Sequence, residues 1–150
     1  MDWLATFRVH PVDQILNGTI IVLTARALGF SAGPLLAYAL LYRAHSMLLH
    51  SNVRVSFGPL GRVFASPRYH HWHHADEPQA YNRNFGGQLI IWDLLFGTLY
   101  EPGTLPSQYG VRGSVPKGYV QQLLAPLRPG RRGGRQSPIP ADLRVSRPAV

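Results

Sequence analysis

The sequence contains no cysteine, and this absence removes several classes of site at once. Without thiols the chain can form no disulfide framework, no thiolate zinc site and no cysteine nucleophile. The first residues also lack the basic start, the apolar core and the small-residue cleavage site of a secretory signal, so we expect no cleaved leader. Any metal chemistry has to rest on carboxylates and on the seven histidines of the chain.

Charged residues are scarce as well, at 15% of the 150 residues, whereas hydrophobic residues make up 45%. Such a composition is not that of a disordered protein, and it predicts one folded domain over residues 1–128. The C-terminal stretch differs, because it is rich in proline and glycine and cannot supply a packed surface. We expect residues 129–150 to form a disordered basic tail.

The formal net charge is +8, and such a surplus usually meets phosphate groups in nucleic acid or in anionic lipid headgroups. Aromatic residues are not interleaved with the basic ones, as the stacking of nucleic-acid bases would require. We therefore expect no nucleic-acid partner. Many of the arginines lie at the end of the chain, at positions Arg128, Arg131, Arg132, Arg135, Arg144 and Arg147.

No apolar run reaches the ~20 residues that an upright membrane-spanning helix needs. Two shorter runs cover residues 15–30 and 35–49, with turn residues between them and with Arg26, Arg43 and His45 as interruptions. One interpretation is a buried helical hairpin in a soluble bundle. The other, which we favour, is a hairpin that enters the bilayer while its arginines reach the interface. The sequence therefore predicts an all-α fold, with an integral-membrane hairpin and histidine-bearing helices outside the bilayer.

The segment His70-His71-Trp72-His73-His74 contains four of the seven histidines. On a helix, His70, His73 and His74 would fall within an arc of roughly 100°, while His71 would point outside it. Nitrogen donors suit iron, zinc and copper better than magnesium or calcium. An adventitious metal-binding run is the alternative, but this run is neither uniform nor terminal. The pattern therefore predicts a metal site.

Two further histidines, His45 and His50, close the second apolar run. Five residues apart, they would lie about 140° apart around a helix, so we do not expect one regular turn to present both to one metal. His50 is the better candidate ligand, because Ser51 and Asn52 follow it and can form supporting hydrogen bonds. A soluble zinc hydrolase is disfavoured, since no general-base carboxylate stands at HExxH spacing.

Several short motifs follow one another along the chain. They are FRVHP at residues 7–11, HSNV at 50–53, SPRYHHWHH at 66–74, NFG at 84–86 and WDLLFGT at 92–98. In order and spacing they resemble the closing part of the sterol desaturase and fatty acid hydroxylase superfamily, over roughly residues 1–127.

The resemblance implies a non-haem di-iron centre, in which zinc can replace iron in preparations. The histidines would lie on the cytosolic side of a multi-pass membrane protein in lipid biosynthesis. Such an oxidoreductase uses dioxygen and electrons from a redox protein to hydroxylate or desaturate a sterol or fatty acyl chain. The metal and catalytic residues implied are His50, His70, His73 and His74, with His45 a less secure ligand, and His10, Asn52, Asn84 and Asp93 would orient or support them.

The sequence departs from this family pattern upstream of the segment with which it begins. Members carry two earlier histidine boxes, but only His10 precedes His45 here. We expect one of three explanations: a start codon further upstream, a lost first half, or a second polypeptide that completes the site. A non-catalytic, metal-binding membrane remnant is the alternative function.

Overall fold

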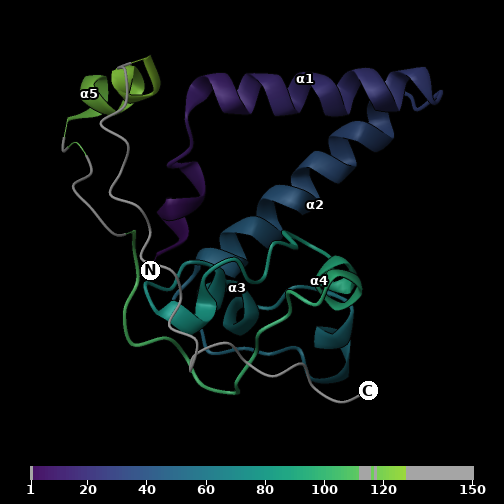
Figure 1. The fold of residues 1–150 in the computed structure, drawn as a ribbon. Helices are drawn as coiled ribbons and strands as arrows, with labels where there is room; N and C mark the ends of the chain where they lie inside the picture. The colour runs from purple at the N-terminus through teal and green to yellow at the C-terminus, as the bar shows by residue number, and fades with distance from the viewer. Residues whose placement is uncertain (1, 112–115, 117, 128–150) are drawn as a thin grey trace.

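A computed structural model describes residues 2–111, 116 and 118–127. Within these residues the secondary structure is helical, with two isolated antiparallel β-bridges and no strand (Figure 1). The predicted all-α fold is therefore confirmed for the described part of the chain. The predicted tail at 129–150 lies outside the described residues.

The two apolar runs form two helices, α1 (Pro11–Ala27) and α2 (Ala32–His50), which diverge as an open V in Figure 1. α1 begins at a proline, whose missing N–H would have had no helical acceptor in the first turn. The chain turns back after Leu28, the C-cap of α1. Gly29 has a φ of 88° in this turn, a conformation that glycine adopts at little cost. The two apolar runs thus form two helices joined by a short turn, called the hairpin below, but the predicted integral-membrane hairpin is not confirmed.

The hairpin exposes most of its apolar side chains. None of the 17 residues of α1 is buried, and Leu49 is the one buried residue of α2. Leu23 on α1 and Leu41 on α2, for example, are 64% and 71% exposed. Among the described residues, no helix combines the length and the hydropathy needed to cross a bilayer. Insertion of the hairpin into a membrane stays a prediction.

The start of the chain packs beside α2. The 3-10 helix η1 (Trp3–Phe7) buries Thr6, whose hydroxyl donates a 3.3 Å hydrogen bond to the carbonyl of Ser46. The Arg43 guanidinium lies 5.3 Å from the centre of the Phe7 ring, in a cation–π contact. These contacts hold η1 against the second half of α2.

Short elements after α2 surround one small core. Leu49 of α2 and Tyr69 of α3 (Pro67–His73) share that core with Ala65 and Ile90. The end of α2 is therefore fixed beside α3, which brings their histidines together. The remaining elements are η2 (Gly58–Arg62), η3 (Pro78–Ala80), α4 (Ile91–Phe96), α5 (Tyr119–Leu124) and η4 (Ala125–Leu127).

Candidate metal centre

The helix α3 carries the histidine run and has a well-defined start. The Ser66 side chain accepts a 3.2 Å hydrogen bond from the Tyr69 N–H, and Pro67 occupies the first helical position. Both features favour the start of the helix at Pro67. His74 is the C-cap, with a ψ of 8°, so the last histidine of the run stands just beyond the regular helix.

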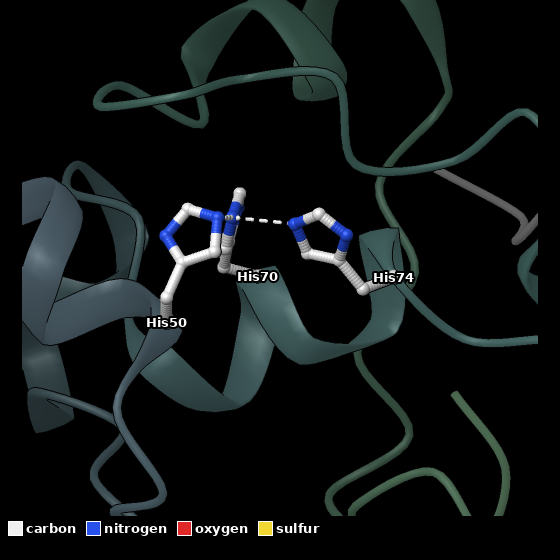
Figure 2. A group of neighbouring side chains, drawn as sticks. All are labelled: His50, His70 and His74. Atoms are coloured by element: carbon white, nitrogen blue, oxygen red, sulfur yellow. Dashed lines mark hydrogen bonds between the residues drawn. The ribbon is translucent and has the colours of Figure 1, made fainter. Parts of the chain in front are cut away.

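Three histidines bring their ring nitrogens together in one group: His50, His70 and His74. His70 Nε2 lies 3.2 Å from His50 Nε2 and 3.1 Å from His74 Nε2. Figure 2 shows the three rings side by side. Two imidazole nitrogens that share a metal at ~2.05 Å would stand about 2.9 Å apart at a right angle and about 3.4 Å apart at a tetrahedral angle. Both distances from His70 fall within this interval, and the ligand nitrogens of all three histidines lie within 4.8 Å of one another.

The hydrogen bond from His50 to Ser46 leaves the other ring nitrogen of His50 unprotonated and directed at His70. His50 Nδ1 lies 2.7 Å from the Ser46 carbonyl and must donate to it, so the neutral ring has an unprotonated Nε2. One proton on His70 Nε2 can form a linear bond to only one of its two neighbours. A metal ion would use these lone pairs, and the donor set therefore fits one.

Burial keeps the imidazoles of His70 and His74 neutral. Desolvation lowers the pKa of His70 to about 2, with further lowering from the neighbouring His74 and His50. Desolvation also lowers the pKa of His74 to about 4, aided by His73. Metal ligation requires the neutral ring, so protons compete weakly for these nitrogens near pH 7.

His70 has a second feature that points to a ligand. Its Nδ1 is buried and has no hydrogen-bond partner among the described residues. A buried polar atom without a partner costs about 1–3 kcal/mol, and such atoms in native proteins usually mark a function or a missing component. The histidine at the centre of the group is thus also the one with unused hydrogen-bonding capacity.

Two predicted ligands lie outside the group of three. The exposed His73 ring lies 5.5 Å from His70 and 5.1 Å from His74, centre to centre, and its Nδ1 lies 3.3 Å from the carbonyl of Arg83. His45 instead hydrogen-bonds the Ala65 carbonyl at 2.9 Å. The structure brings neither ring nitrogen into the group, and their assignment as ligands stays a prediction.

Asn84 supports α3 through hydrogen bonds to its backbone. This fully buried amide donates to the carbonyls of Tyr69 and Tyr100, at 2.9 and 2.8 Å, and accepts a 2.7 Å bond from the Tyr100 N–H. Its φ is 56°, in the left-handed region that asparagine tolerates better than most residues. Since Tyr69 precedes His70, the amide supports the backbone that carries the His70 ring.

Asp93, on α4, is the second brace and is also fully buried. Its carboxylate accepts hydrogen bonds from the Tyr69 hydroxyl, the Thr98 hydroxyl and the backbone N–H groups of Phe85 and Gly86, at 2.5 to 2.8 Å. Burial raises the pKa of Asp93, but the four hydrogen bonds outweigh it and hold the pKa below its usual value. The charged carboxylate therefore ties α4 to α3.

The two remaining supporting candidates have other partners. His10 is the N-cap of α1, where its Nδ1 accepts a 3.2 Å bond from the Val12 N–H. Its Nε2 lies 3.1 Å from the Leu123 carbonyl, to which it donates. The side chain of Asn52 is exposed. Their predicted role of orienting the metal ligands finds no support in these contacts.

Sequence reasoning gave no role to two residues beside the site, His71 and Tyr109. His71 is 1% exposed and lies 3.0 Å from both the Ser51 carbonyl and the Tyr109 hydroxyl. Its predicted direction, outside the arc of the other histidines, was the available signal. Tyr109 stands far along the chain, and no sequence pattern marked it.

Comparison with known proteins identifies a family and several relatives for this chain. The fatty acid hydroxylase family model matches residues 1–98. The chain is 42% identical to the ornithine lipid hydroxylase OlsE of Rhizobium tropici over 88 residues, which cover 57% of this chain and 27% of that protein. It is 41% identical to the alkylglycerol monooxygenase of Caenorhabditis elegans over 51 residues, covering 34% and 10% of the two chains.

The human alkylglycerol monooxygenase is 36% identical over 63 residues, which cover 42% of this chain and 14% of that protein. The chain thus spans well under a third of each of these relatives. No solved structure matches it. Because the family model covers about two thirds of the sequence and includes all three convergent histidines, the chain belongs to the fatty acid hydroxylase family.

Proposed function

We propose that this chain carries part of the metal site of an oxygen-dependent lipid hydroxylase. The observation that carries the proposal is the convergence of His50, His70 and His74 on one point, within the residues that match the family. The relatives named above are a lipid hydroxylase and alkylglycerol monooxygenases, and for this reason we favour hydroxylation over desaturation. A fatty acyl or alkyl lipid is the proposed substrate class, with a sterol as an alternative.

The metal we propose is iron, and a di-iron centre in the complete site. His50, His70 and His74 would hold one ion, and the adjacent His73 is available to a second. Bound iron would supply the activation of dioxygen that oxidation of a C–H bond requires, with electrons from a redox protein. Zinc also suits imidazole donors and could occupy the same nitrogens in preparations.

The protein's own contribution is to hold the donors in place. The Ser46 carbonyl orients the His50 ring through Nδ1, which leaves Nε2 free toward the centre. Asn84 and Asp93 fix the backbone and side chain of Tyr69, next to His70. Such supporting contacts set ligand orientation in metal sites and commonly affect metal affinity 10–100-fold.

We also propose that the protein acts at a membrane, with the histidine group on the cytosolic side. The apolar side chains exposed along α1 and α2 support this, because a lipid surface would cover them. The exposed Trp92, Leu95 and Phe96 of α4 would lie at the same interface.

The experiment is a paired measurement of metal and oxygen incorporation. The coding region that contains this chain is expressed in cells, and membranes are isolated. We measure their iron content and the incorporation of isotopically labelled dioxygen into the extracted lipids. We expect both signals in the wild type, and expect His70→Ala to lose both. Retention of iron and of lipid oxygenation by His70→Ala would overturn the proposal.

A second candidate is a metal-binding protein without oxidation chemistry, either alone or as a half-site completed by another polypeptide. Three histidines with an open position suffice to bind zinc, and this observation favours the candidate. The same experiment separates the two functions. Bound metal without oxygen incorporation identifies the second, and recovery of oxygenation on addition of a partner polypeptide identifies the half-site.

A further inference from the structure

His71 is a buried histidine outside the metal group, the set formed by His50, His70 and His74. It connects two distant parts of the chain. One side of its ring faces the Ser51 carbonyl, directly after His50 at the end of α2. The other side faces the hydroxyl of Tyr109, 38 residues further along the chain. The Tyr109 ring also packs edge-on against the imidazole, at 5.5 Å between centres.

These contacts define one protonation pattern. A carbonyl oxygen can only accept, so His71 Nε2 must carry the proton and donate to Ser51. In the neutral ring Nδ1 is then an acceptor, and the Tyr109 hydroxyl donates to it. Burial lowers the pKa of His71, which favours this neutral form. The ring is therefore held from both sides in one orientation.

Tyr109 belongs to the 104–110 segment, which runs along the histidine helix. The Gly110 N–H donates to the carbonyl of His74 at 3.1 Å, and the Asp76 N–H donates to the carbonyl of Gln108 at 3.0 Å. The Trp72 indole N–H donates to the carbonyl of Thr104 at 2.9 Å. The segment lies beyond residues 1–98 that match the family. It therefore supports α3 with residues outside the matched part.

We infer that His71 and Tyr109 are positioning residues for the metal site: Tyr109 orients His71, and His71 holds the end of α2 so that His50 meets His70 and His74. This inference rests on the proposed metal site. Its physical basis is that His50 reaches the group from a different helix than His70 and His74, so its distance from them depends on how the end of α2 is anchored. His71 provides that anchor one residue after His50.

The test uses cobalt as a spectroscopic probe of the 150-residue chain in detergent. His71→Phe removes both hydrogen bonds and keeps a ring, Tyr109→Phe removes the hydroxyl alone, and His71→Gln restores a donor that can reach the Ser51 carbonyl. We expect His71→Phe to weaken cobalt binding 10–100-fold and to shift the visible cobalt bands. Tyr109→Phe should have a smaller effect, and His71→Gln should recover most of the affinity.

Trp72→Phe is the matched control. It removes another hydrogen bond from the same helix to the 104–110 segment, but it leaves the bond between His71 and Ser51 in place. We expect a lower melting temperature with unchanged cobalt bands. If His71→Phe and Trp72→Phe alter the cobalt bands equally, or if His71→Gln behaves as His71→Phe does, the positioning role is wrong.

Hydrogen exchange of the metal-free chain separates this inference from the proposed function. We expect His71→Phe, but not Trp72→Phe, to accelerate amide exchange at the end of α2, because the anchor at Ser51 is lost. Equal exchange in the two variants would overturn the inference. Failure of the wild type to bind any metal would overturn the proposed function instead, whatever the exchange shows.

Discussion

The Tyr69 hydroxyl donates a 2.5 Å hydrogen bond to the Asp93 carboxylate, across 24 residues of sequence. Tyr69 immediately precedes His70, the central histidine of the metal group, and both Tyr69 and Asp93 are 1% exposed. Burial and the neighbouring carboxylate raise the pKa of the tyrosine hydroxyl above its usual value, so it stays a proton donor. This pair joins α3 to α4 and is the basis of the first two predictions.

Asp93→Asn should lower the free energy of unfolding by about 1.5–3 kcal/mol, the range for hydrogen bonds to a charged group. The amide keeps one acceptor oxygen and places an NH2 group at the position of the other, facing the N–H of either Phe85 or Gly86, so one bond is lost and a repulsive contact is created. Urea unfolding measures the change. Asp13→Asn is the control, because Asp13 makes an exposed side-chain bond to Asn17. Equal losses in the two variants would contradict a buried brace.

The same carboxylate predicts a dependence of stability on pH. The folded-state pKa of Asp93 lies below its usual value of 3.8, so the unfolded state takes up this proton first as the pH falls. The stabilisation is complete well above pH 3.8 and is lost as the pH falls through the folded-state pKa. We expect wild type and Asp93→Asn to converge in stability below pH 3.8. A difference between them that is constant down to the lowest pH would exclude this linkage.

Gly86 stands where a side chain has no room. A Cβ would lie 2.4 Å from the Leu89 carbonyl oxygen and 2.9 Å from the Asp93 carboxylate. Gly86→Ala should therefore destabilise the fold by about 1–3 kcal/mol, as overpacking does. Gly87→Ala is the neighbouring control, since nothing lies within 4 Å of its Cβ position. Thermal unfolding compares the two, and similar melting temperatures would refute the packing argument.

Metal binding should discriminate among the histidines. His50→Ala, His70→Ala and His74→Ala should each reduce the affinity for metal by more than about 100-fold. That factor is the largest usually seen when a supporting residue is lost. His45→Ala should leave affinity within that limit, because His45 bonds to the Ala65 carbonyl instead. Zinc or cobalt titration of the purified chain measures this. A large loss for His45→Ala with none for His74→Ala would show that the group of three is not the site.

The exposed leucines of the hairpin should govern binding to lipid. Leu23→Asp with Leu41→Asp places two charges on the apolar surfaces of α1 and α2, and each costs up to about 3 kcal/mol at the centre of a bilayer. We expect vesicle flotation to fall at least tenfold. Leu60→Asp is the control, since Leu60 is equally exposed but lies on η2. Equal flotation of all variants would argue against a lipid-facing hairpin.

Several features of the site were predictable because they depend on local spacing. Helical periodicity places His70 and His74 on one face, and the 140° between His45 and His50 predicts that one regular turn does not present both to one metal. The preference for His50 came from the neighbouring Ser51 and Asn52. The contact partners of His73 and His45 were not predictable, since they depend on the loop carbonyls of Arg83 and Ala65. Spacing along one helix predicts which rings share a face, but it does not predict which residues contact that face.

By itself, the sequence determined the two helices of the apolar runs, the histidine run and the family to which the chain belongs. Periodicity and short motifs are local properties, so they can be read without knowing the fold. Only the tertiary structure decided that His50 joins His70 and His74, that Asp93 holds Tyr69, and that His71 links Ser51 to Tyr109. Each of these contacts bridges 20 or more residues, and packing of the small core around Leu49 and Tyr69 brings the partners together.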